Sequence, residues 1–163
     1  MKHVISALVA LFSAAALAQN CPLDPTAKTS LNLSVADLAG LPQTERVQRR
    51  TLASSDSASP PALEQSVRYS GVLLRDVLAR TVPADNNRAA RTLVFEAVAT
   101  DGYRAVFTWG EIFNSSAGEQ VLVISAQDGR PLGAEQGPLA LRALADLRPG
   151  PRHVRNLCGV VVR

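Results

Sequence analysis

Cys21 and Cys158 are the only cysteines of this 163-residue chain, and no other pair of residues constrains the fold as much. If they form a disulfide, the start of the domain must lie beside its last strand. The closed loop would be long, so the chain-entropy model gives a stabilisation on the order of 4–5 kcal/mol. A metal site is the poorer interpretation, because no His or Cys lies at ligand spacing around either cysteine. We therefore expect a Cys21–Cys158 disulfide if the chain reaches an oxidising compartment.

The N-terminus has the features of a secretory signal peptide. A short positive start precedes an apolar run from Val4 to Leu17, and Ala16-Leu17-Ala18 supplies the small residues that signal peptidase needs. This run is too short to span a bilayer, and no other apolar stretch is long enough. A lipoprotein anchor is not expected, since small residues do not directly precede Cys21. The sequence therefore predicts a periplasmic or secreted protein with a signal peptide over 1–18, a tail over 19–30 and one domain over 31–163.

The charge balance is only weakly basic. The chain has 17 Lys and Arg against 14 Asp and Glu, and one of the basic residues, Lys2, falls in the predicted signal peptide. Such a balance does not predict binding to nucleic acid or to an anionic membrane. Apart from Lys2 and Lys28, every basic residue is arginine, which fits the codon usage of a GC-rich genome. The alternative is that a few arginines bind phosphate or carboxylate through two parallel hydrogen bonds.

The apolar pattern predicts several short strands and two or three short helices. We expect strands over 31–35, 47–52, 66–70, 92–99, 121–125, 139–144 and 160–163, and helical turns over 35–42, 72–81 and 108–113. Asp101-Gly102 between two apolar runs predicts a hairpin with a type I′ turn, and Asp128-Gly129 predicts a second tight turn. These elements give an α+β domain that is mainly β.

Motifs of known catalytic chemistry are missing from the sequence. There is no G-x-S-x-G elbow, no H-E-x-x-H and no Gly-rich phosphate loop. His153 is the only histidine after the predicted signal peptide, and no serine is marked as its partner in a catalytic triad.

The C-terminal third resembles a known family. Asp128-Gly129-Arg130-Pro131-Leu132, then Gly137-Pro138 and Arg142, then Gly150-Pro151-Arg152-His153-Val154-Arg155 are similar to successive motifs of the oxidoreductase molybdopterin-binding domain, which has the sulfite oxidase fold. Arg155 replaces the family's usual lysine. Further upstream, SVADLAGLP, YSGVLLRDVL and DGYRAVFTWGEI resemble the corresponding segments, so the likeness covers nearly all of residues 31–162.

The resemblance implies a mainly β sulfite-oxidase-like fold and a set of ligand-binding residues. The molybdenum cofactor ends in a phosphate and carries a hydrogen-bonding pterin, for which arginine and backbone N–H groups are suitable partners. The matching positions are Arg142, Arg152 and Arg155, with His153 beside them. Tyr103 matches a tyrosine that can face the substrate in enzymes of this fold. For each residue a structural role in a turn, a core or a solvated surface is the alternative.

One position departs from the enzymes of the family. They bind molybdenum through a cysteine thiolate after the first core strand, and Ser54 stands at or within one residue of that place. A serine hydroxyl is a poor ligand for a soft metal beside a thiolate. The resemblance therefore implies the fold, less strongly the cofactor, and argues against sulfite-oxidase-type catalysis.

Three functions remain open from the sequence. The first is a module that binds a small anionic ligand, molybdopterin or a relative, without redox turnover. The second is a genuine periplasmic molybdenum-dependent oxidoreductase, although the N-terminus lacks a twin arginine for export of a folded, loaded protein. The third is a periplasmic sensor or accessory module that binds a protein partner, in which Arg142, Arg152 and Arg155 would point to solvent and would not converge on a pocket.

Overall fold

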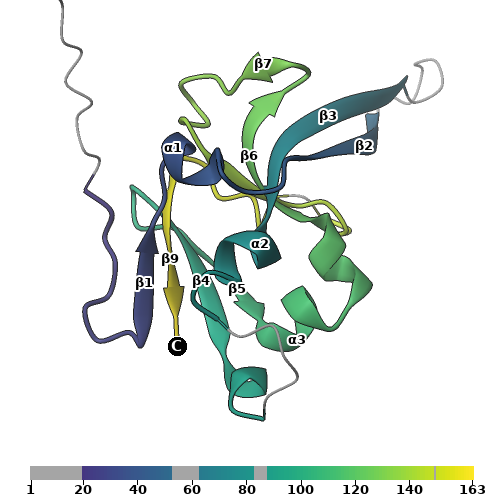
Figure 1. Cartoon of the computed structure of the whole chain (residues 1–163). Helices are drawn as coiled ribbons and strands as arrows, with labels where there is room; N and C mark the ends of the chain where they lie inside the picture. Colours follow the sequence, from purple (N-terminus) through teal and green to yellow (C-terminus); the bar gives the residue numbers. More distant parts are fainter. Residues whose placement is uncertain (1–19, 53–62, 83–87, 149) are drawn as a thin grey trace, which may run out of the picture.

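Two antiparallel sheets and a few short helices make up the domain (Figure 1). The structure is a computed structural model, and it describes residues 20–52, 63–82, 88–148 and 150–163. The predicted signal peptide and Ser54 lie outside these residues. Within them, no helix is long and apolar enough to cross a membrane.

The first sheet, sheet A, has the strand order β1-β9-β4-β5, so the last strand of the chain lies between the first strand and β4. The second, sheet B, has the order β2-β3-β6-β7. Strand β7 pairs with the C-terminal end of β6, and β8 pairs with the N-terminal part of β6. The strands are β1 (Thr29–Asn32), β2 (Thr44–Leu52), β3 (Leu63–Leu73), β4 (Val94–Ala99), β5 (Arg104–Thr108), β6 (Val121–Gln127), β7 (Arg130–Pro131), β8 (Ala140–Ala143) and β9 (Leu157–Val162).

The helices are single turns at the ends of strands. They are α1 (Val35–Leu38), α2 (Leu74–Leu78), η1 (Ala90–Thr92), α3 (Trp109–Phe113) and η2 (Ser116–Gln120). Ser34 caps α1 and forms a capping box with Asp37, while Thr108 accepts a hydrogen bond from the Glu111 backbone at the start of α3, as the sequence predicted for Thr108. The expected helix over 72–81 is shorter than predicted, because β3 continues to Leu73.

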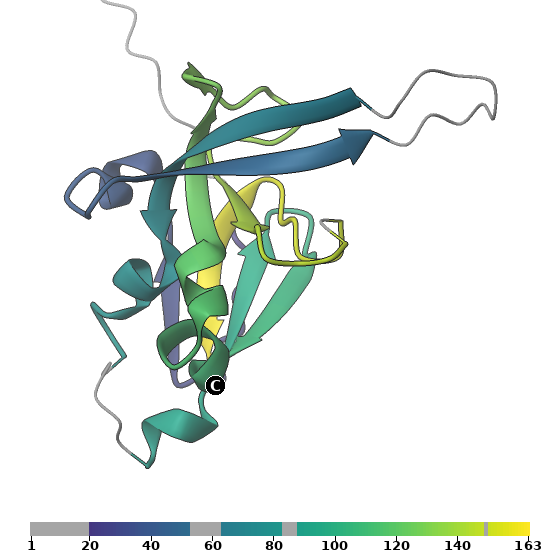
Figure 2. The ribbon, with the colours of Figure 1, turned by 90° about the vertical axis from the view of Figure 1, so that its right-hand side faces the viewer.

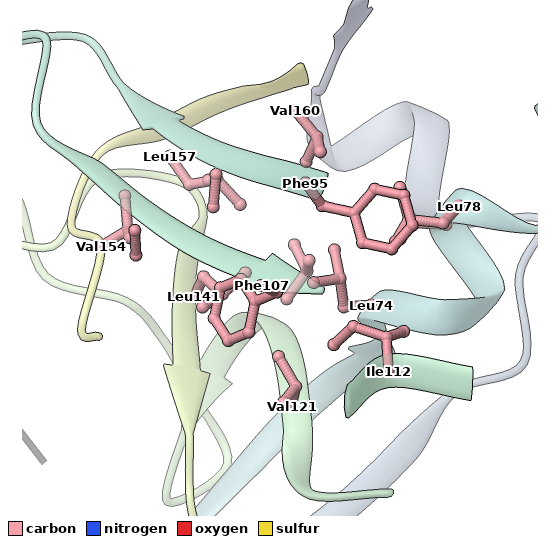
Figure 3. Close-up of a cluster of buried hydrophobic side chains, with 14 of the residues drawn as sticks. Leu74, Leu78, Phe95, Phe107, Ile112, Val121, Leu141, Val154, Leu157 and Val160 are labelled. Carbon is pink, nitrogen blue, oxygen red and sulfur yellow. The ribbon is translucent and has the colours of Figure 1, made fainter. Parts of the chain in front are cut away.

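The main core lies between the sheets and the helices α2 and α3 (Figure 3). Phe95 and Phe107 contribute from sheet A, and Leu74 and Ile112 from the helices. A second cluster covers the other face of sheet B around Tyr69, Leu122 and Ile124. Residues of β6 therefore alternate between two cores, which explains why this strand reads as a continuous apolar run.

The β2–β3 hairpin bends where it leaves the core. The register between β3 and β6 shifts at Ser70/Gly71, and a Cβ on Gly71 would lie 2.1 Å from the Val123 carbonyl oxygen, so only glycine fits there. Before this bend, β3 pairs with β2 back to Leu63, whereas its pairing with β6 begins at Tyr69. The outer part of the hairpin therefore extends beyond the sheet (Figure 2).

Both predicted hairpin turns form, but one has a different geometry. Asp128 and Gly129 have φ values of 51° and 75°, as a type I′ turn requires. At the turn between β4 and β5, by contrast, Gly102 has a φ of 88° and Asp101 does not have a positive φ. The Gly102 N–H donates to the Ala99 carbonyl over 3.0 Å, and the Ala99 N–H to the Tyr103 carbonyl over 2.9 Å. The type I′ prediction for Asp101-Gly102 is therefore wrong, because three residues lie between the hydrogen-bonded Ala99 and Tyr103 and such a loop needs only one left-handed position.

The disulfide between Cys21 and Cys158 is present, with their Cα atoms 5.5 Å apart. It attaches the N-terminal tail to β9, where Gly159 leaves the space that the sulfur atom of Cys21 needs, since a Cβ on Gly159 would lie 3.1 Å from it. Arg163 donates to Asp24 over 2.7 Å, and Arg104 donates to the Pro22 carbonyl oxygen over 2.7 Å. The tail is thus an ordered part of the domain.

We predict that this disulfide supplies a large share of the stability. Replacing both Cys21 and Cys158 with alanine should lower the free energy of unfolding by about 2–5 kcal/mol, because the unfolded chain loses a constraint between residues 137 positions apart. Denaturant unfolding monitored by circular dichroism measures the change. Wild-type protein unfolded in the presence of a thiol reductant is the matched control and should behave like the double variant. A loss below about 1 kcal/mol would contradict the prediction.

Candidate anion-binding cavity

A polar cavity of about 400 Å³ lies where β3, β6 and β8 meet the C-terminal loop. Three of the predicted ligand residues line it, namely Arg142, His153 and Arg155. We call it the Arg142 cavity. Its other lining residues are Gln65, Val67, Tyr69, Gln127, Glu135, Gln136 and Gly150.

Arg142 is held at the buried end of this lining. It lies on β8 opposite Leu122 of β6, and only 7% of its surface is exposed. Its Nη2 donates to the hydroxyl of Tyr69 over 2.9 Å, and its guanidinium carbon lies 5.0 Å from the centroid of the Tyr69 ring. A hydrogen bond and a cation–π contact to one fully buried tyrosine thus fix the orientation of the positive charge.

The two loops that carry the other lining residues are joined by backbone hydrogen bonds. The Asn156 N–H donates to the Gln136 carbonyl over 2.7 Å, and Val154 and Leu141 exchange both of their backbone bonds. Gly137, with a φ of 75°, packs so closely that a Cβ there would lie 2.4 Å from the Asn156 side-chain oxygen. Gln136, His153 and Arg155 are therefore presented by loops that are attached to β8 and to each other.

The electrostatics of the lining favour a ligand with negative charge. Arg142 and Arg155 carry positive charge, and Glu135 is the only carboxylate among the described lining residues. Arg155 is exposed, and within the described residues it forms no hydrogen bond or ion pair. The amides of Gln65, Gln127 and Gln136 add both donors and acceptors, so the cavity can also bind a neutral polar group of the same ligand.

Arg152 lies outside the cavity lining and serves a different purpose. Its guanidinium binds the carboxylate of Asp146 through two hydrogen bonds and that of Glu111 through a third, and it lies 4.8 Å from the centroid of the Phe107 ring. The hydrogen bonds to Asp146 and then Glu111 raise the pKa of Arg152 above its usual value. Arg152 thus anchors the C-terminal loop to β5 and α3, and its geometry does not support the predicted ligand contact.

One further predicted site residue, Tyr103, is not among the residues that line the cavity. Tyr103 is 46% exposed, and its hydroxyl donates to the Pro151 carbonyl oxygen over 2.6 Å, so it supports the C-terminal loop from the outside. Ser54 lies outside the described residues. Of the predicted ligand residues, the structure thus brings Arg142, His153 and Arg155 together around one cavity, and Arg152 and Tyr103 lie elsewhere.

Sequence reasoning missed most of the polar lining. Gln65 and Tyr69 lie on the face of β3 that also carries Val67, and the alternation in this strand could have identified them as one face. Nothing local in the sequence marks Gln127 or Gln136 as a site residue. In the described part of the chain, no three His, Cys, Asp or Glu side chains lie close enough to hold a metal ion.

We predict that Arg152 acts on stability. Arg152→Gln should lower the free energy of unfolding by about 2 kcal/mol, because it leaves two partly buried carboxylates without their cation. Arg148→Gln, which changes an exposed arginine in the same segment, is the control and should stay within about 0.5 kcal/mol of wild type. Chemical denaturation measures both. If Arg152→Gln left stability unchanged but abolished ligand binding, the anchoring role would be wrong.

Comparison with known proteins agrees with this architecture. A search of curated proteins found no match. The family model described as "Oxidoreductase molybdopterin binding domain" matches residues 23–163, which is nearly the whole chain and includes both sheets, the Arg142 cavity and the C-terminal strand. This match and the mainly β architecture confirm the resemblance found in the sequence. The chain is therefore a member of the oxidoreductase molybdopterin-binding domain family.

Proposed function

We propose that this protein binds a small anionic ligand in the Arg142 cavity and has no redox turnover of its own. The observation that carries the proposal is that a buried, oriented guanidinium and a second arginine line one cavity with His153. A buried cation is far more favourable when an anion shares its environment, because the low dielectric strengthens the attraction. Arg142 is held in place before the ligand arrives, so little conformational entropy is lost on binding.

The family's cofactor fits this donor set only in part. Molybdopterin carries a phosphate, for which Arg142, Arg155 and His153 are suitable, and a pterin, for which the three glutamine amides are suitable. The molybdenum of the cofactor fits these residues less well than its phosphate and pterin do. The family's enzymes use a cysteine thiolate, whereas both cysteines of this chain are bonded to each other and Ser54 stands at or within one residue of the matching position. Molybdopterin without a thiolate-bound metal, or another anion with a hydrogen-bonding ring, is thus the ligand class that we propose.

Export to the periplasm is part of the same proposal. The predicted signal peptide and the disulfide support it, because disulfides persist in oxidising compartments. An oxidised cysteine pair also removes the only thiols that could have bound a metal.

Anion binding can be tested with inorganic phosphate as the probe. We expect phosphate to raise the melting temperature of the protein more than sodium chloride does at equal ionic strength, because only the native state holds the cavity. Arg155→Gln should weaken phosphate binding about fivefold to tenfold, which corresponds to about 1 kcal/mol for one charge-assisted hydrogen bond at an exposed site. Titration calorimetry measures the dissociation constants.

Arg148→Gln is the matched control for this experiment. It removes the same charge from the same segment but does not line the cavity, so its phosphate affinity should equal that of wild type. If Arg148→Gln and Arg155→Gln weakened phosphate binding equally, phosphate affinity would depend only on the net charge of the protein. That result would contradict anion binding in the Arg142 cavity.

The absence of redox turnover gives a second test. Protein purified from the periplasmic fraction should have the intact mass of a chain that begins at Gln19 and contains the disulfide. Its molybdenum content should be far below one atom per chain. Mass spectrometry and elemental analysis measure these quantities on one sample. Stoichiometric molybdenum together with oxidation of sulfite by an artificial acceptor would overturn the non-catalytic part and leave anion binding in place.

A further inference from the structure

Strand β2 is an open edge of sheet B. It pairs with β3 in an unbroken register from Thr44 to Leu52, without a bulge, and it contains no proline. In the described part of the chain, no strand pairs with its other side, and Figure 2 shows it along the outside of the extended hairpin. A long edge strand of this kind is a template for another strand, because its outward backbone groups have no partner in the sheet.

The exposed face of this strand has a definite charge pattern. Glu45, Val47 and Arg49 are all exposed and alternate with Arg46 and Gln48, which point to the other face. Arg46 and Gln48 donate to backbone carbonyls of Glu119 and Leu144, so they hold the strand to the domain. Val47 is 57% exposed, so it offers an apolar side chain that a second strand could cover.

Symmetry restricts how two copies of β2 can pair. In an antiparallel pair, residues that face each other project from the same side of the sheet. A twofold axis between two copies of one strand must therefore lie midway between the two copies of a single residue. An axis at Val47 places Val47 opposite itself and Glu45 opposite Arg49, and the second contact occurs twice. An axis at Arg46 would place this arginine opposite itself, and one at Gln48 would place Val47 opposite Arg49. Because opposite charges stabilise a cross-strand pair and like charges destabilise it, only the Val47 axis suits the sequence.

We propose that β2 is a dimerisation edge, on which a second copy of this chain adds its own β2 in antiparallel register about Val47. The two copies of sheet B then form one continuous sheet. Val47 of each copy is covered by the other, and two Glu45–Arg49 pairs flank this contact. None of these residues lines the Arg142 cavity, so the dimer and the anion site can succeed or fail separately.

Analytical ultracentrifugation over a wide range of protein concentration tests the edge. Wild type should show a monomer–dimer equilibrium. Arg49→Glu should raise the dimer dissociation constant about tenfold or more, because both attractive pairs become repulsive. Glu45→Arg should do the same, and the exchanged double variant Glu45→Arg/Arg49→Glu should restore wild-type association.

Arg68→Glu is the matched control, since Arg68 is exposed on the same face of the neighbouring strand, directly opposite Val47 within the hairpin. It makes the same charge change away from the edge and should leave the dissociation constant unchanged. A protein that is monomeric at every concentration would overturn the proposal. So would a dimer that Arg49→Glu and Arg68→Glu weaken equally, or one that the exchanged double variant fails to restore. Circular dichroism of each variant verifies that it is folded.

Discussion

The burial of β9 is the constraint on which the rest of the structure depends. All six of its residues are buried, and it pairs with β1 on one side and with β4 on the other. It therefore joins the start of the domain to its middle. The disulfide at Cys158 strengthens the same junction, and the hydrogen bonds of Arg163 with Asp24 and Glu96 close its far end. Hydrogen bonds from Arg163 and Arg104 lower the pKa of Glu96, so this closure is strongest when that carboxylate is charged.

The position of β9 also determines where the site residues lie. The loop that enters this strand carries His153 and Arg155, and its start is held by the ion pairs of Arg152. Its end is held by the backbone of Leu157, which donates to the Leu139 carbonyl over 2.9 Å. A loop fixed at both ends can hold a charged side chain in one position. The second positive charge, that of Arg142, comes from a strand that is buried throughout. The anion cavity is thus a consequence of how the C-terminus is attached to both sheets.

The sequence was informative where the physics is local. The turn at Asp128-Gly129, the Thr108 cap and the apolar run of β6 follow from a few neighbouring residues, and these were predicted. Arg142, His153 and Arg155 were singled out through the family resemblance, and the structure places all three around one cavity, although their role as ligand residues stays a prediction. The role of Arg152 depends on Glu111, 41 positions away, and that of Arg142 on Tyr69, 73 positions away. Neither partner can be chosen from composition or spacing, since only the tertiary packing of distant elements brings these residues together.

The remaining question is how this chain can keep the fold of a metal-cofactor family without the thiolate. The fold is stabilised by two cores and by the closure of the chain ends, and neither depends on a metal ligand. In a domain of this size the cysteines can serve either stability or a metal, because an oxidised pair has no thiolate to donate. Here both are used to join the tail to β9. The cationic cavity does not depend on that choice, because its charges come from arginines on β8 and on the C-terminal loop. The proposed anion binding therefore does not depend on the metal chemistry of the family's enzymes, and the fold alone is a weak guide to catalysis.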